Sequence, residues 1–342
     1  MHTVQPGSLI LVTGATGFIG SWVTKTLLEK GYAVRAAART SEKGGYLRDL
    51  FKDHADKFEI VVVPDISKPH AYDEALEGVA GIVHAAGVAS FSGDDASKVL
   101  GPAVEGTAGL LNSAYERGKT LRRFVYLSSC QALLGKELTY IYTEADWNDE
   151  AVTAVQEKSA AANAQTYYQA SKVLAERSIF DFVKNHKNEV GWDVVSLLPS
   201  FTYGPVIHDF KTRDDLNLSS RMFYEHMTVL KDKSEVNNYG ADYVDVRDVA
   251  AAIVSSFQTE AAGGERFILD AGAYTFQNLY DALHSTSVPG DKVPLGDPEA
   301  PKWSFPGPFC NPSKAQKVLG VKFRSLDETA SDSLMSLIQK GF

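Results

Sequence analysis

The sequence predicts an α/β protein with a doubly wound parallel sheet and a smaller mixed lobe in the C-terminal part of the chain. Three observations lead to this fold class. Short apolar runs alternate with longer amphipathic segments through the first 200 residues. The runs are apolar along their whole length, as in parallel strands covered on both faces. A glycine-rich segment, residues 12–20, separates the first run from the first helical segment.

Six buried strands are expected, each separated from the next by a helical segment. The first strand, "SLILVTG", precedes a helix that ends at Gly31. The expected strands cover residues 8–14, 33–39, 58–64, 81–87, 122–129 and 192–200. This alternation is typical of a Rossmann sheet, the doubly wound fold that binds dinucleotides.

The pattern changes after Pro199, and the change predicts the domain organisation. Residues 1–200 form the expected dinucleotide-binding Rossmann domain, and residues 241–260 return to it as a strand and a helix. Residues 201–240 and 261–342 form the expected substrate-binding lobe, which is rich in turns and closes with two helices.

Composition excludes several classes of protein. The chain of 342 residues has 43 acidic and 34 basic residues, and a net charge of -9 argues against nucleic-acid binding. No apolar run reaches the ~18 residues that span a bilayer, and the first residues lack the pattern of a secretory signal. Cys130 and Cys310 form no CxxC pair, so we expect a cytoplasmic protein without a disulfide framework.

The segment "VTGATGFIG" predicts a site for a diphosphate. Gly14 is expected to form the tight turn, Gly17 to let the backbone approach the phosphates, and Gly20 to allow close packing of helix and sheet. Thr13, Phe18 and Ile19 flank these glycines and complete the predicted contact set. The helix that begins here supplies unpaired N–H donors and a partial positive charge. The alternative is an ordinary turn between strand and helix.

The end of the second strand indicates which dinucleotide binds. An NAD site usually has an acidic residue there, whereas this strand ends in Arg39, with Lys43 four residues later. A guanidinium binds a 2′-phosphate that a carboxylate would repel, so the sequence predicts NADP(H). The alternative is a solvated arginine without a ligand.

Residues after the third and fourth strands complete the predicted cofactor site. Asp65 and Ile66 are expected beside the adenine, and Ala85, Ala86 and Gly87 beside the ribose and diphosphate. His84, at the end of the fourth strand, is interpreted as a packed core residue. No His, Cys or carboxylate grouping has the spacing of metal ligands, so no metal is expected.

The stretch "TYYQASK" contains the predicted proton donor. Positions four apart on a helix share a face, which pairs Tyr168 with Lys172; Tyr167 is five positions from Lys172 and points elsewhere. A free tyrosine has a pKa of about 10, and a nearby ammonium favours the phenolate, which makes the group a better acid and base. The alternative is an accidental pair on an amphipathic helix.

A serine is expected to polarise the substrate carbonyl. Ser128 and Ser129 follow the fifth strand, at the edge of the sheet where ligands bind in this fold. Strand alternation points the two side chains in opposite directions, so one of them faces the site. A hydroxyl there would stabilise negative charge that develops on the carbonyl oxygen.

Taken together, these motifs resemble the extended short-chain dehydrogenase/reductase superfamily. The resemblance rests on "TGATGFIG", on the Ser129, Tyr168 and Lys172 set, on "LLPSFTYGP" and on "YVDVRDVA". Within the superfamily, "ARTSEK", "HAAGVASF", "TEADWND" and "KAQKVLGVKFRSLDET" resemble the dihydroflavonol-reductase-like branch, which includes fungal and yeast ketone and aldehyde reductases.

The resemblance implies NADPH-dependent reduction of a carbonyl compound to an alcohol. Tyr168 would supply the proton, Ser129 rather than Ser128 would polarise the carbonyl, and Lys172 would position the ribose and the tyrosine. The nicotinamide would lie beside Pro199, Phe201 and Thr202. The sequence departs from the superfamily at Ala103, where many members have an asparagine that serves a water relay.

Residues outside the sheet are expected to select the substrate. The predicted pocket is aromatic and apolar, which suits aryl or alkyl ketones, keto esters and aldehydes. Its residues are Phe91, Tyr142, Tyr203, Met222 and Phe223. We expect a carbonyl reductase that acts as a monomer or homodimer. The alternatives are a sugar-nucleotide epimerase or dehydratase on the same scaffold, and a regulator that senses NADP without turning it over.

Overall fold

A parallel sheet of seven strands forms the centre of the molecule. The computed structural model describes residues 2–87, 97–135, 139–157, 162–228, 233–237, 240–286, 288, 293–297, 299 and 309–342. The strands of the sheet are β1 (Leu9–Thr13), β2 (Ala33–Ala38), β3 (Phe58–Val62), β4 (Val79–His84), β5 (Arg123–Leu127), β7 (Asp193–Pro199) and β10 (Arg266–Leu269). Their order across the sheet is β10-β7-β5-β4-β1-β2-β3.

The order of the strands confirms the predicted doubly wound fold. All neighbouring strands in this sheet run parallel. The order reverses between β1 and β4, and ligands of such folds bind at this point, outside the carboxyl ends of the strands.

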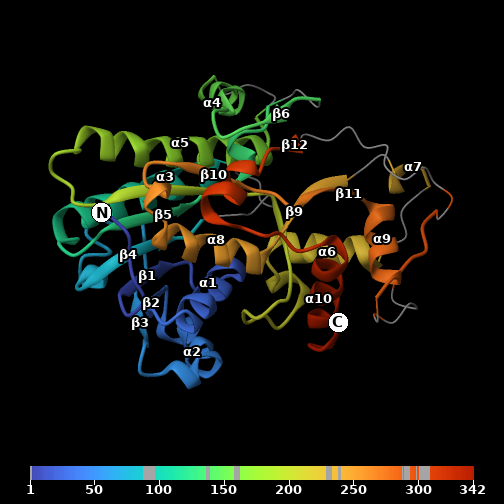
Figure 1. Ribbon diagram of the computed structural model, residues 1–342, viewed down its shortest axis with the longest axis horizontal. Coiled ribbons are helices and arrows are strands. Elements are labelled where there is room, and N and C mark those ends of the chain that lie inside the picture. The colour runs from blue at the N-terminus through green and yellow to red at the C-terminus, as the bar shows by residue number, and fades with distance from the viewer. Residues whose placement is uncertain are drawn as a thin grey trace.

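Helices cover both faces of the sheet. Helices α1 (Phe18–Glu29) and α8 (Val246–Gln258) pack together on one face, and α3 (Ser97–Arg117) and α5 (Ala164–Asn185) on the other (Figure 1). Helix α2 (Ser41–Leu50) follows β2, and the Thr40 side chain caps its first turn by accepting a hydrogen bond from the Lys43 N–H. The sheet therefore has an apolar core on each side, which explains why its strands lack polar alternation.

A second, mixed sheet forms the smaller lobe. Strand β9 (Gly240–Asp245) pairs in parallel with β8 (Phe201–Tyr203) and in antiparallel with β11 (Gly272–Thr275). The helices of this part are α6 (Leu218–Thr228), α7 (Lys233–Val236), α9 (Phe276–His284) and α10 (Leu326–Ile338). They lie around the small sheet, away from β1 to β4 (Figure 1).

A third group of elements lies beside the N-terminal half of α5. Strands β6 (Ile141–Tyr142) and β12 (Phe309–Cys310) pair in parallel, and α4 (Asp149–Gln156) packs on α5. These elements share an apolar cluster with residues that directly follow β5, including Cys130 and Leu133. They therefore border the carboxyl edge of the large sheet.

The structure corrects the predicted domain boundaries at two places. Strand β10 was expected in the substrate lobe, but it is the edge strand of the large sheet, beside β7. Strand β9 was expected to return to the large sheet, but only the helix after it, α8, does so. The sequence pattern that could have indicated β10 is short, because the strand has only the four residues "RFIL", between the polar residues Glu265 and Asp270. All four are buried. Among the described residues, no helix is long and apolar enough to cross a membrane.

Candidate active site

The glycine-rich loop packs tightly against the segment that follows β4. Gly14 has a positive φ of 69°, and a Cβ placed on it would lie 2.8 Å from backbone atoms of Ala85 and Ala86. A Cβ on Gly20 would lie 2.0 Å from the Gly14 carbonyl oxygen. Both positions therefore exclude a side chain, as predicted for a turn that brings helix and sheet together.

The start of α1 is left open to an anion. Gly17 occupies the N-cap position, and it provides no side-chain hydrogen bond to the first turn. The first N–H groups of a helix have no partner within the helix. The Phe18 side chain is buried and that of Ile19 is half-buried in the core, so these two residues face a ligand through their backbone. This arrangement fits a bound diphosphate.

Thr13 acts on the site through its neighbours. Its side chain is buried, and its hydroxyl oxygen lies 2.7 Å from Nδ1 of His84 and accepts a hydrogen bond from the Ala86 N–H. The other His84 nitrogen lies 3.1 Å from the Thr107 hydroxyl. Burial, and then the charge of Lys172, lower the pKa of His84 to about 3. His84 is therefore a neutral core residue that holds the loop after β4, as interpreted from the sequence.

The predicted cofactor residues at the other end of the site lie at the surface. Arg39 and Lys43 are exposed beside the start of α2, where a 2′-phosphate would be accessible to both. Asp65 accepts hydrogen bonds from the backbone and hydroxyl of Ser67, which lower the pKa of its carboxyl. Ile66 packs against Gly106 of α3. Their contacts with a cofactor stay predictions.

Tyr168 and Ser129 meet at the carboxyl end of β5. A hydrogen bond joins their side chains, and Tyr168 is half-buried. Burial raises the pKa of Tyr168, and the hydrogen bond with Ser129 opposes this effect. The Ser129 hydroxyl also accepts a hydrogen bond from the Gln131 N–H, which begins a short 3₁₀ turn over Cys130–Ala132. The phenol is therefore held in its protonated form beside a second hydroxyl.

Lys172 lies one helical turn beyond Tyr168. Its Nζ donates a hydrogen bond to the Leu127 carbonyl oxygen at 3.1 Å and lies 5.9 Å from the centre of the Tyr168 ring. A Cβ placed on Gly87 would lie 3.5 Å from the same nitrogen. Burial lowers the pKa of Lys172 to about 8, against the opposing charge of Glu176. Tyr168 and Lys172 therefore share one face of α5, as the spacing of four residues in "TYYQASK" predicted.

The two serines point in opposite directions, as strand alternation predicts. The Ser128 hydroxyl donates a hydrogen bond of 2.7 Å to Oε2 of Glu176, away from Tyr168. Glu176 is fully buried and also pairs with Arg266 of β10. Neither Glu176 nor Arg266 was among the residues predicted from the sequence. The available signal was the spacing of four residues between Lys172 and Glu176.

Most of the predicted substrate-pocket residues are packed inside the protein. Tyr203 and Phe223 are 2% and 1% exposed and pack in the core of the smaller lobe, and their contact with a substrate stays a prediction. The Tyr142 hydroxyl accepts a hydrogen bond from the Gly135 N–H. Met222 is half-buried on α6. Phe91 lies outside the described residues.

The three residues predicted beside the nicotinamide follow the end of β7. Pro199 is its last residue and is buried, and Phe201 stacks on Tyr203 with ring centres 6.3 Å apart. The Thr202 hydroxyl donates a hydrogen bond to the Ser200 carbonyl oxygen. This segment joins the large sheet to the small one, next to the end of β10.

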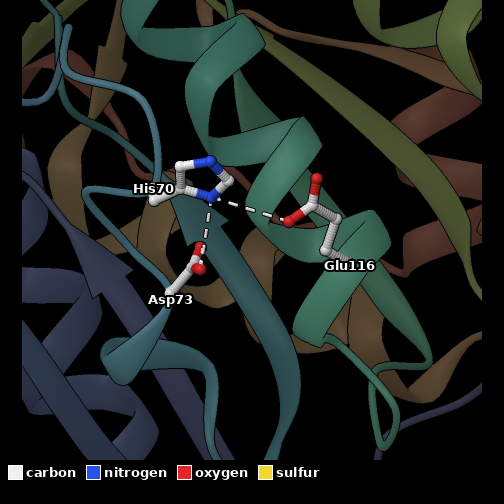
Figure 2. A group of neighbouring side chains, drawn as sticks. All are labelled: His70, Asp73 and Glu116. Atoms are coloured by element: carbon white, nitrogen blue, oxygen red, sulfur yellow. Dashed lines mark ion pairs between the residues drawn. The ribbon is translucent and has the colours of Figure 1, made fainter.

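Among the residues that the structure describes, two groups of possible metal ligands come together in space, although the sequence spacing did not indicate them. His70, Asp73 and Glu116 form one, at the surface: both carboxylates approach Nδ1 of His70, at 3.3 and 3.5 Å (Figure 2). Asp73 also pairs with the exposed Arg117. Exposed ion pairs of this kind need no metal. Asp242, Asp270 and Cys310 form the second group, in which two of the three residues are buried.

These features define a class of protein. A glycine loop at the switch point of a doubly wound sheet, and a tyrosine, a lysine and a serine at the same edge, indicate a dinucleotide-dependent enzyme of the short-chain dehydrogenase type. The chain belongs to the NAD dependent epimerase/dehydratase family, which it matches over residues 10–271. The predicted family is therefore confirmed.

Individual relatives cover almost the whole chain. A ketoreductase of Aspergillus niger is 33% identical over 344 residues, 97% of this chain and 98% of that protein. An NADPH-dependent methylglyoxal reductase of Saccharomyces cerevisiae is 30% identical over 344 residues, 96% of this chain and 98% of that protein. The crystal structure of a yeast methylglyoxal/isovaleraldehyde reductase complexed with NADPH has a TM-score of 0.85 at 28% identity, covering 97% of this chain and 98% of that one.

Proposed function

We propose that this protein is an NADPH-dependent carbonyl reductase that converts small, apolar ketones and aldehydes to alcohols. The hydrogen-bonded Ser129 and Tyr168 pair, with Lys172 one turn away, carries the proposal. Relatives that match the chain end to end are named as ketone or aldehyde reductases. Methylglyoxal, isovaleraldehyde, aryl ketones and keto esters are the substrates to test first.

The residues present fit NADPH. The open N-terminus of α1 and the side-chain-free positions Gly14 and Gly17 would hold its diphosphate, and Arg39 with Lys43 its 2′-phosphate. Asp65 and Ile66 would border the adenine. When bound, the cofactor supplies the hydride. The small residues after β4, which are Ala85, Ala86 and Gly87, would border the ribose and diphosphate.

The chain's own residues supply the proton and the polarisation. Tyr168 keeps its proton because burial raises the pKa of its phenol, and it donates that proton to the substrate oxygen. Ser129, whose hydroxyl is hydrogen-bonded to Tyr168, would donate a second hydrogen bond to the same oxygen. Lys172 is charged below pH about 8, and its ammonium favours loss of the phenol proton.

A sugar-nucleotide epimerase on this scaffold is less consistent with the smaller lobe. Such a substrate needs cations for its own diphosphate, and Arg247 is already committed to ion pairs with Asp245 and Asp332. Arg213 stacks on the Tyr224 ring, 4.7 Å from its centre. An apolar carbonyl compound makes no such demand.

A panel of carbonyl compounds tests the proposed activity. Methylglyoxal, isovaleraldehyde, an aryl ketone and a keto ester are each mixed with the protein and NADPH, and the loss of NADPH absorbance is followed. We expect net NADPH oxidation with at least one of them, and an alcohol as the product. Turnover of a nucleotide sugar without net NADPH consumption would instead support the epimerase.

Arg39→Asp tests the cofactor preference. A carboxylate at this exposed position repels a 2′-phosphate, so we expect NADPH affinity to fall at least about tenfold while NADH affinity changes little. Fluorescence titration of both cofactors measures the effect. Arg48→Asp, the same charge reversal at the other end of α2, is the matched control. Equal losses for NADPH and NADH would contradict the assignment.

The proposal extends to a cytoplasmic protein that acts as a monomer or homodimer and binds no nucleic acid. Both cysteines are free thiols, as in a reducing compartment, and the net charge of -9 opposes binding to phosphate backbones. Light scattering during size-exclusion chromatography and a fluorescent fusion test the oligomeric state and the location.

A further inference from the structure

A buried ion pair lies behind Lys172, on the side away from Tyr168. Glu176 is one helical turn beyond Lys172 on α5, so Tyr168, Lys172 and Glu176 follow one another along a single face. The Glu176 side chain is 0% exposed and that of Arg266 only 9%. Charges this far from water are costly unless each is paired and hydrogen-bonded.

The Glu176 carboxylate accepts three hydrogen bonds from two residues. Arg266 donates from Nε to Oε1 at 2.8 Å and from Nη2 to Oε2 at 3.2 Å. Ser128 donates to Oε2 from the end of β5. Ser129, the residue after Ser128, is hydrogen-bonded to Tyr168. Glu176 therefore links α5, which carries the Tyr168 hydroxyl, to the end of β5, which is followed by the Ser129 hydroxyl.

Arg266 is itself fixed in place. Its Nη1 donates to the carbonyl oxygens of Glu144 and Asp146, and its guanidinium lies 3.7 Å from the centre of the Trp147 ring. The guanidinium is therefore satisfied on the side away from Glu176. An apolar pair could join α5 to β10 equally well, so the charges call for a role beyond packing.

The groups that face Lys172 identify that role. They come from three elements: His84 of β4, Tyr126 of β5, and Tyr168 with Glu176 of α5. Burial lowers the pKa of His84 and raises the pKa of both tyrosines, so all three are neutral near pH 7. Among these groups, Glu176 carries the negative charge.

We propose that Glu176 is a positioning residue of the reductase: its carboxylate, anchored by Arg266 and Ser128, is the countercharge that keeps the Lys172 amine protonated beside Tyr168. The inference rests on the proposed function for its catalytic meaning, while the charge of Lys172 is measurable without NADPH or a substrate. It also gives Arg266 a definite and opposite effect, because its positive charge partly offsets that of Glu176.

The test follows the titration of Lys172 directly. Protein containing lysine labelled with ¹³C at Cε is titrated by NMR, and the Lys172 signal is assigned by its absence in Lys172→Met. The wild-type signal should titrate near pH 8. In Glu176→Gln we expect the midpoint to fall by about one pH unit or more, and in Arg266→Gln to rise.

A second comparison keeps the test valid if Glu176→Gln does not fold with Arg266 left unpaired. Glu176→Gln combined with Arg266→Gln removes both charges, and its midpoint should lie below that of Arg266→Gln alone. Two variants on the same helix serve as controls: Asp181→Asn removes an exposed acid, and Arg177→Gln removes a cation that pairs with Asp149 and also contacts Trp147. Neither should move the midpoint.

The pH profile of carbonyl reduction supplies the functional readout. The basic limb of kcat should shift in the same direction as the Lys172 midpoint in each variant, which lost packing alone would not produce. Identical midpoints in Arg266→Gln and the double variant would overturn the inference. Shifted midpoints with no reduction of any carbonyl compound by the wild type would instead reject the reductase proposal, and with it the catalytic meaning of Glu176.

Discussion

Replacing Tyr168 by phenylalanine should reduce kcat for carbonyl reduction by about a thousandfold, because general acid catalysis contributes 10²–10⁴-fold. The substitution removes one oxygen from a half-buried side chain and leaves the ring in place. NADPH binding should stay within about threefold of the wild-type value, because the aromatic ring is kept. A threefold change in affinity corresponds to well under 1.4 kcal/mol. Stopped-flow measurement of NADPH oxidation and a fluorescence titration provide the two values.

The neighbouring residue provides the matched control for this substitution. Tyr167→Phe removes the same oxygen one position earlier, from a half-buried ring that packs against the cluster around Cys130 and Leu133. It should retain nearly full activity. A Tyr168→Phe enzyme with kcat within tenfold of the wild type would show that another group supplies the proton.

The fold was accessible from the sequence because its strands follow a simple rule. Parallel strands buried on both faces are largely apolar, and six of the seven strands lie within the first 200 residues; of these six, all but the edge strand β3 are mostly buried. Strand β10 escaped detection because it has only four residues and follows the small lobe's β9 and the returning helix α8. Its place is decided by pairing with β7, which local periodicity does not encode.

In the candidate site, too, residues close together in the sequence were predictable, and residues that meet through tertiary packing were not. Tyr168 and Lys172 share one helix, and Ser128 and Ser129 one strand end, so helical and strand geometry alone predicted how they point. Glu176 and Arg266 are 90 residues apart and meet only because β10 lies beside β7. Tyr203 and Phe223 show a different limit: their packing in the core of the smaller lobe depends on tertiary contacts that the sequence pattern does not encode.

Alanine substitutions at two glycines of the nucleotide loop should have different effects, one mainly on NADPH affinity and the other on the stability of the fold. At Gly17 an added methyl group meets nothing closer than 3.4 Å, and φ of −90° suits any residue. The methyl group would, however, occupy the open start of α1. Gly17→Ala should therefore lower the melting temperature only slightly, because alanine is a poorer N-cap than glycine, while NADPH affinity falls at least about tenfold, or 1.4 kcal/mol.

Gly20→Ala should instead damage the protein itself. Its methyl group would lie 2.0 Å from the Gly14 carbonyl oxygen, so α1 must move away from the sheet at a cost of about 1–3 kcal/mol. Differential scanning calorimetry should show a lower melting temperature, with NADPH binding weakened as well. Gly191→Ala, in open space before β7, is the control and should change neither. Unaltered NADPH affinity in Gly17→Ala would mean that the diphosphate does not bind over this turn, and the cofactor site would then have to lie elsewhere along the carboxyl edge of the sheet.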